Sequence, residues 1–222
     1  MIFFDISDTS IEAVKLSKGF FGESINAFAR VELKDGPVEA GEVEDKDALA
    51  KTITKLLKAG KPRGISDLEC GFTLPDSRVY THRFTLPQRR DHQTVLDLVG
   101  GKMEKLIPQP LEELIYRFFP LGEGEGEGEV FMMAISKKLI KGYVECFGDV
   151  GLRPKFVVPE SYAAFRFLDP LIDAQETILY LDIGGEYSNA VLMDKHGVVE
   201  TFSEPVESTD LFKEVGKLLE FT

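Results

Sequence analysis

The chain has 222 residues, 43% of them hydrophobic, so it can bury the core of one large domain or two small ones. Its formal net charge of −12 argues against nucleic acid and against unaided binding to anionic lipid. No stretch approaches the roughly 20 apolar residues of a membrane helix. Cys70 and Cys146 stand far apart without histidine-rich neighbours, which excludes a disulfide framework and a zinc site. The N-terminus shows no basic leader or cleavage site, so we expect a soluble cytoplasmic protein.

The first third of the chain predicts a meander of strands followed by a helix. Alternating apolar residues indicate strands over residues 2–7, 11–16 and 25–33. An acidic stretch comes next, and then a helix over about residues 46–59, where leucine and isoleucine recur at helical spacing until Gly60. Residues 70–75 are typical of a buried strand that ends at a proline.

The remaining elements predict an inserted block. We expect a strand, helix, strand, loop, strand and helix, at about residues 79–87, 91–106, 114–119, 122–129, 130–135 and 137–148. A strand at 156–159, a helix at 160–172, a hairpin at 177–203 and a helix at about 208–220 follow. The pattern predicts three parts: 1–78 with 151–175, an inserted β-α-β-β-α subdomain at 79–150, and 176–222.

Two segments about 175 residues apart share one pattern, at residues 3–16 and 179–193. Each has an apolar strand, an aspartate, a small polar turn and a second strand. Such a hairpin aims backbone N–H groups and hydroxyls into its mouth, where a phosphate can sit. The aspartate can hold a metal ion, usually through water. Two such hairpins facing each other would clamp a nucleotide.

The candidate phosphate residues are Asp5, Ser7, Thr9 and Ser10 in the first hairpin, and Asp182, Gly184, Gly185 and Glu186 in the second. Asp5 and Asp182 are the candidate metal ligands. The alternative is that both are ordinary β-hairpins, because aspartate, serine and threonine are common in turns. Glu12 and Glu186 do not complete a catalytic set with any other residue, so no catalytic residue is predicted.

With its elements in this order, the chain resembles the actin-like ATPase family, in particular the PilM branch that assembles type IV pili. The resemblance is carried by residues 5–16, 72–87, 105–108, 151–152, 158–166 and 181–189. It implies an α/β fold, the actin-like ATPase (ribonuclease H-like) fold, with an inserted α+β subdomain and truncated before the last subdomain. The chain departs from the family at Ser7, where the first phosphate motif has glycine. A serine there would hinder a positive φ, and the neighbouring Asp8 would repel a phosphate.

The resemblance also implies a function. It predicts a cytoplasmic scaffold, peripheral to the inner membrane, that docks the N-terminal tail of a bitopic membrane protein, PilN, in a groove beside the inserted subdomain. ATP with Mg²⁺ would act as a conformational ligand at the two hairpins, with at most weak ATPase activity. Phe84, Leu86, Leu96 and Val99 are the predicted peptide contacts. Self-association is expected too, because an incomplete last region would expose an apolar face.

Three alternatives remain open from the sequence. A true ATPase or kinase of this fold would need a competent catalytic carboxylate. A division protein similar to FtsA would carry an amphipathic membrane helix at its C-terminus, where the segment Asp210–Thr222 is short and acidic. A secretion-platform component similar to the cytoplasmic part of GspL would lack nucleotide binding, which agrees with the departure at Ser7.

Overall fold

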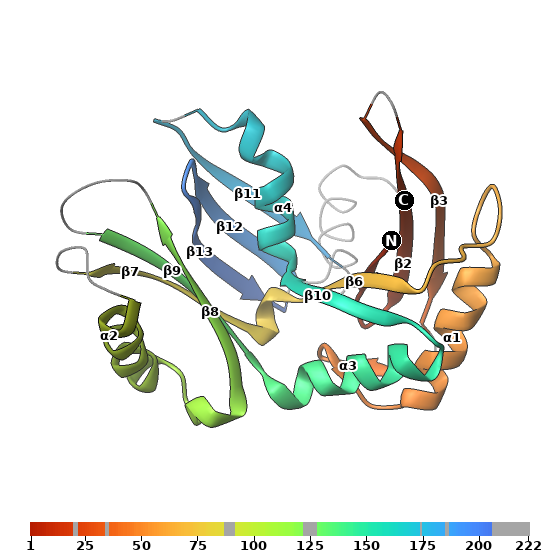
Figure 1. Ribbon diagram of the computed structural model, residues 1–222, viewed down its shortest axis with the longest axis horizontal. Helices are drawn as coiled ribbons and strands as arrows, with labels where there is room; N and C mark the ends of the chain where they lie inside the picture. The colour runs from red at the N-terminus through yellow and green to blue at the C-terminus, as the bar shows by residue number, and fades with distance from the viewer. Residues whose placement is uncertain are drawn as a thin grey trace, which may run out of the picture. The chain divides into compact units, whose positions relative to one another are not determined.

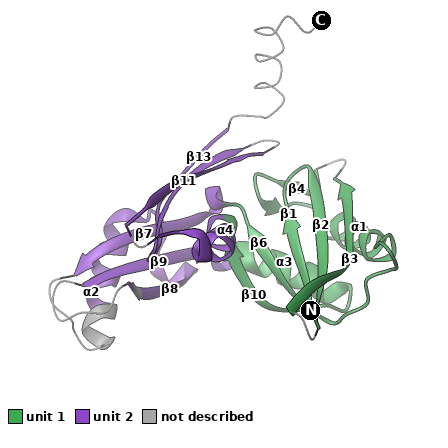
Figure 2. Ribbon diagram, turned by 90° about the horizontal axis from the view of Figure 1, so that it is seen from above, with its two compact units in different colours: residues 1–75, 138–160 green, residues 76–137, 161–222 purple. Residues whose placement is uncertain are grey.

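The computed structural model describes residues 1–19, 22–33, 36–86, 92–121, 128–173, 175–184 and 187–205, without the side chains of 92–96 and 120 (Figure 1). The chain forms two compact units (Figure 2). Unit 1 comprises Met1–Pro75 and Lys138–Glu160, and unit 2 comprises Asp76–Lys137 and Ser161–Thr222. The division into three parts has other boundaries and stays a prediction.

Unit 1 is built on a five-stranded mixed sheet in the order β10-β6-β1-β2-β3. Strands β1, β2 and β3 form an antiparallel meander, and β6 and β10 join β1 in parallel. The bounds are β1 Ile2–Ile6, β2 Ser10–Gly19, β3 Gly22–Glu32, β6 Glu69–Leu74 and β10 Arg153–Pro159. A two-stranded ribbon, β4 Val38–Glu39 with β5 Glu42–Val43, lies within the acidic stretch, where the sequence predicted no strand.

Two helices supply the apolar cover of this sheet. Helix α1 (Lys46–Lys58) begins at Asp45, whose carboxylate accepts a hydrogen bond from the backbone N–H of Ala48 at 2.9 Å. Its buried stripe is Leu49, Ile53 and Leu56, as helical spacing predicted. Helix α3 (Lys137–Asp149) packs Phe147 against rings of β1 and β6, 5.0 Å from Phe4 and 5.2 Å from Phe72 between centroids.

Unit 2 holds two three-stranded antiparallel sheets. The first has the order β7-β9-β8, with β7 Val79–Leu86, β8 Leu114–Leu121 and β9 Gly128–Ser136. Helix α2 (His92–Leu106) packs on one face of it through a core that includes Phe84, Val99, Met103 and Met132. The loop predicted to reach Glu129 is shorter at that end, because Gly128 and Glu129 already pair with β7. Residues 122–127 lie outside the described part.

The second sheet runs β11-β12-β13, with β11 Thr177–Ile183, β12 Ser188–Asp194 and β13 Gly197–Glu204. Helix α4 (Glu160–Leu168) contributes Phe165 to a core shared with Phe131, Val191 and Met193. The helix is shorter than predicted and passes into a single turn of 3₁₀ helix at Asp169–Leu171. Pro170 is the reason, because proline lacks an N–H and disfavours the α conformation of the residue before it.

Candidate functional site

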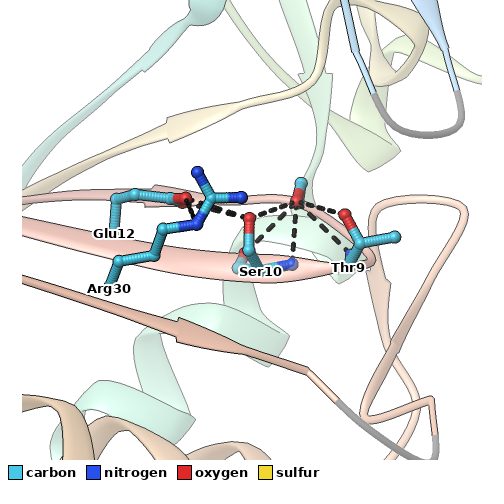
Figure 3. A network of polar contacts seen from close by, with 5 residues as sticks. Thr9, Ser10, Glu12 and Arg30 are labelled. Carbon is cyan, nitrogen blue, oxygen red and sulfur yellow. Dashed lines mark hydrogen bonds and ion pairs between the residues drawn. The ribbon is translucent and has the colours of Figure 1, made fainter. Parts of the chain in front are cut away.

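The first hairpin joins β1 to β2 in unit 1, and the strand–turn–strand prediction is confirmed. Asp5 lies opposite Glu12 and Ile6 opposite Ile11. This register places the polar turn directly beyond the last apolar pair, with Asp5 and Glu12 on neighbouring strands beside it. A network of hydroxyl, amide, carboxylate and guanidinium groups fills this end of the hairpin (Figure 3).

The hydroxyl of Ser7 is the centre of that network. It accepts hydrogen bonds from the backbone N–H groups of Ser10 at 3.0 Å and of Thr9 at 3.4 Å, and it donates to the carbonyl oxygen of Ser10 at 3.2 Å. The hydroxyl of Ser10 donates to the carboxylate of Glu12, at 3.0 Å to the nearer oxygen. Glu12 also pairs with Arg30, whose Nε lies 3.1 Å away.

The backbone angle φ at Ser7 is not positive. Ala40 is the one described non-glycine residue with a positive φ, so Ser7 does not take up the left-handed conformation. This agrees with the expectation that a serine hinders a positive φ at this position. Relative to the glycine of the family motif, this serine therefore adds a hydroxyl group at the mouth of the hairpin.

Acidic side chains of the hairpin have partners in the protein. Asp5 accepts a hydrogen bond from the hydroxyl of Thr73 at 2.6 Å, and Asp8 accepts one from the backbone N–H of Gly41 at 2.8 Å. The pKa of Glu12 is raised, chiefly because burial disfavours its charged form, and the charge of Asp5 adds to the rise. The hydrogen bond from Ser10 and the charge of Arg30 act in the opposite direction and lower the pKa. The turn is therefore held by internal contacts in a negative environment.

The second hairpin joins β11 to β12 in unit 2, with Asp182 opposite Asn189. The backbone N–H of Gly184 donates to the carbonyl oxygen of Tyr187 at 3.1 Å. A Cβ atom at position 184 would lie 2.4 Å from that oxygen, so this position requires glycine. Gly185 and Glu186 lie outside the described residues, and their predicted contact with phosphate stays a prediction.

The first hairpin does not fit the phosphate groups of ATP. The amide groups of Thr9 and Ser10, which would bind a phosphate, already donate to Ser7, and the adjacent carboxylates are repulsive. Across the described residues, no group of three or more histidine, cysteine, aspartate or glutamate side chains is placed to hold a metal ion. Metal binding at Asp5 or Asp182 stays a prediction.

The predicted peptide contacts lie in the core of the β7-β9-β8 sheet. Phe84 and Leu86 are each 3% exposed and Val99 is 1% exposed, and all three pack in one cluster with α2. The side chain of Leu96 lies outside the described part. Contact with a peptide at these positions stays a prediction, but exposed residues of the same sheet are better placed for it.

Strand β8 offers such exposed residues. Its alternate side chains Leu114, Tyr116 and Phe118 pack toward the α2 core, while Ile115 is 41% and Phe119 is 38% exposed. In the described part of the chain β8 pairs with β9 alone, so it is an edge strand. An edge strand with exposed apolar side chains suits an extended peptide that adds to the sheet.

Two polar contacts of unit 2 were not predicted from the sequence. The carboxylate of Asp76 is 5% exposed and accepts hydrogen bonds from the backbone N–H of Ser161 at 2.9 Å and from its hydroxyl at 2.5 Å. Arg83 pairs with Asp194 at 2.7 Å and with Glu129 at 3.0 Å. The sequence carried no signal for either contact, because a charged residue in an alternating segment does not identify its partner.

The face of the β11-β12-β13 sheet opposite Val191 and Met193 is apolar and exposed. Leu179, Leu181, Ile183 and Phe202 are between 51% and 62% exposed. The sequence predicted an exposed apolar face in this region.

We expect this face to promote self-association, since contiguous apolar surface is removed from water when two copies meet. Replacement Leu181→Glu should shift the chain toward monomer in sedimentation equilibrium. Leu171→Glu is the matched control, because Leu171 is 74% exposed in the same unit and lies outside this sheet. Equal association of both variants and the unchanged chain would contradict the expectation.

Solved structures define the class of protein. The chain is similar to a chain of a PilM–PilN type IV pilus biogenesis complex, with 21% identity and a TM-score of 0.83 over 100% of this chain. It is similar to the cytoplasmic domain of EpsL, an inner membrane component of the type II secretion system of Vibrio cholerae (14% identity, TM-score 0.56), over 95% of this chain and 72% of that one. It is also similar to the ethanolamine utilization protein EutJ from Carboxydothermus hydrogenoformans (13% identity, TM-score 0.54) over 100% of this chain. The fold is therefore the actin-like ATPase fold, as predicted.

The family follows from the sequence. Residues 4–199 match the family described as type IV pilus assembly protein PilM. This chain belongs to the PilM family. It spans 66% of the length of the matched chain in the PilM–PilN complex and 57% of that of EutJ. No curated protein sequence matches it.

Proposed function

We propose that this chain is a scaffold component of a type IV pilus assembly platform, which binds the cytoplasmic N-terminal tail of a PilN-like inner-membrane protein. The observation that carries the proposal is membership of the PilM family over residues 4–199. The structural relative with a TM-score of 0.83, which occurs in a complex with PilN, supports the same partner.

The same proposal places the protein in the cytoplasm, peripheral to the inner membrane through its partner. No helix among the described residues is long and apolar enough to cross a membrane. The net charge of −12 disfavours direct attraction to anionic lipid headgroups. A protein partner is therefore the better means of attachment.

Strand β8 is the docking edge that we favour. Its free side can supply main-chain hydrogen bonds to an extended tail, and Ile115 and Phe119 supply apolar contacts. Arg117 is exposed between them and adds a positive charge. Phe119 also lies 6.2 Å from the ring of Tyr162 in a stacked arrangement, which holds one side of this surface in place.

Titration with a synthetic peptide tests the proposal. The peptide would be the cytoplasmic N-terminal segment of the PilN-like protein from the same organism, measured by isothermal calorimetry. We expect Ile115→Glu to weaken binding roughly tenfold or more, because it replaces an apolar contact by a charge that must be desolvated.

Ile25→Glu is the matched control for this substitution. Ile25 is also a strand isoleucine, 66% exposed, but it lies on β3 of unit 1. Its replacement should leave the peptide affinity unchanged. Absence of binding by the unchanged chain would refute the function, whereas equal effects of the two variants would refute β8 as the docking edge.

A secretion-platform role is the second candidate. It is favoured by the fold shared with EpsL and by the internal contacts that fill the first hairpin. Parallel pull-downs with pilus and secretion partners separate the two roles. A division role similar to FtsA would require binding to anionic liposomes in sedimentation, and the segment Asp210–Thr222 that would mediate it lies outside the described residues.

ATP as a conformational ligand, which the resemblance implies, is not part of this proposal. The proposed docking does not require it, because the β8 surface and the first hairpin belong to different units and use different residues.

A further inference from the structure

We infer that the first hairpin of this chain is closed to phosphate by the side chain of Ser7, which occupies the donors that a nucleotide would need. This inference concerns the hairpin alone and does not depend on the proposed docking. The backbone N–H groups of Ser7, Thr9 and Ser10 and the hydroxyl groups of Ser7 and Ser10 already have acceptors within the hairpin.

The backbone N–H groups of Ser7, Thr9 and Ser10 are engaged within the turn. The N–H groups of Thr9 and Ser10 both donate to the hydroxyl oxygen of Ser7, at 3.4 Å and 3.0 Å. The N–H of Ser7 donates across the hairpin to the carbonyl oxygen of Ser10 at 3.0 Å. A hydroxyl oxygen accepts two hydrogen bonds, so Ser7 takes the place that a phosphate oxygen would otherwise fill.

The hydroxyl groups of Ser7 and Ser10 are engaged as well, and that of Thr9 lies 3.3 Å from the hydroxyl oxygen of Ser7. Each serine hydroxyl has one proton to donate. That of Ser7 points to the carbonyl of Ser10 at 3.2 Å, and that of Ser10 to the carboxylate of Glu12 at 3.0 Å. A bond to an ionised carboxylate is stronger than one between neutral groups, so Ser10 is not readily released toward an incoming anion.

The charges around the turn act in the same direction. Asp5, Asp8 and Glu12 lie within or directly beside the turn, and the guanidinium of Arg30 is paired with Glu12 at 3.1 Å. An incoming phosphate would lose its hydration, displace the Ser7 hydroxyl and approach these carboxylates. Each of these steps is unfavourable.

The substitution Ser7→Gly isolates the contribution of this side chain. It removes the hydroxyl and leaves the amides of Thr9 and Ser10 without their acceptor. Ser7 is not in a left-handed conformation, so glycine relieves no strain there and the fold should be kept. Ser7→Thr retains a hydroxyl at the same position, and Ser24→Gly changes another serine of unit 1 that is exposed on β3.

Amide hydrogen exchange and chemical shifts of Thr9 and Ser10 test the inference. In the unchanged chain, in Ser7→Thr and in Ser24→Gly we expect protected amides that do not shift on addition of inorganic pyrophosphate with Mg²⁺. In Ser7→Gly we expect exchange of each amide faster by about tenfold, since each has lost its hydrogen bond to Ser7, and a saturable shift of both resonances.

Two results would overturn the inference. Saturable shifts in the unchanged chain would mean that the hairpin is open to phosphate in spite of Ser7. A Ser7→Gly variant that is folded by circular dichroism but shows no shift would mean that the hydroxyl is not what closes the hairpin.

Discussion

Replacing Arg83 by methionine is expected to lower the free energy of unfolding by about 1.5 kcal/mol, because Arg83 is largely buried while its partners Asp194 and Glu129 are 25% and 46% exposed and can be partly hydrated after its loss. The side chain of Arg83 is 10% exposed, and its guanidinium lies 2.7 Å from Asp194 and 3.0 Å from Glu129. Methionine keeps most of the length of the side chain and its apolar contacts. The decrease in the free energy of unfolding therefore measures the contribution of the charge.

The carboxylate of Asp194 carries part of the expected loss. Burial by itself would raise the pKa of Asp194, but the bonds from Arg83 and from the backbone of His196 outweigh it, so the pKa lies below its ordinary value. This part of the stability is present at neutral pH and is lost as the pH falls through the lowered pKa. Without Arg83 the pKa of Asp194 should rise, which carboxyl NMR titration measures directly.

Urea unfolding followed by far-ultraviolet circular dichroism measures the change in stability, since the chain contains no tryptophan. Arg117→Met is the matched control on the same sheet. Arg117 is exposed, and its guanidinium donates to the carbonyl oxygen of Tyr116 at 3.2 Å. Its replacement should change the free energy of unfolding by about 0.5 kcal/mol at most. Similar losses in both variants would show that the ion pair does not carry the effect.

Asp76→Asn is expected to change the pH dependence of stability by about 3 kcal/mol between pH 4 and pH 7. Burial raises the pKa of Asp76 to about 6, while the two bonds from Ser161 oppose the rise and the charge of Asp182 adds to it. A difference of about two pH units from the ordinary value near 4 corresponds to about 3 kcal/mol.

The sign follows from the raised pKa. Between about pH 4 and pH 6 the folded chain keeps a proton on Asp76 that the unfolded chain has released. The contribution of Asp76 to stability is therefore greatest below pH 4, declines as the pH rises toward 6, and is constant above that. Asparagine cannot ionise, so the stability of the variant relative to the unchanged chain should increase over this window.

Unfolding midpoints measured at several pH values for both chains check this expectation. Asp173→Asn, at an exposed aspartate of the same unit, controls for the loss of one charge. Parallel profiles for Asp76→Asn and the unchanged chain would show that the pKa of Asp76 is the same in the folded and the unfolded state.

Some features of the fold could be predicted from local pattern, because they depend on residues close in sequence. The stripe of Leu49, Ile53 and Leu56 predicted α1, and its acidic cap at Asp45 agrees with where the helix begins. The alternation of apolar residues on β3 predicted a strand, but it did not predict that the first residues of this strand are exposed to solvent. A bulge opposite Lys15 and Leu16 shifts the register, and Ile25 is 66% exposed although it continues the apolar pattern.

By itself the sequence determined the two hairpins, the order of elements and the resemblance to the PilM family, since these are read along the chain. Tertiary structure alone decided how the polar residues are used. The hydroxyl of Ser7 accepts from the amides of Thr9 and Ser10, Phe84 and Leu86 pack in the core with α2, and Asp76 binds Ser161 from 85 residues away. Side-chain direction and long-range partners depend on packing, which local periodicity does not encode.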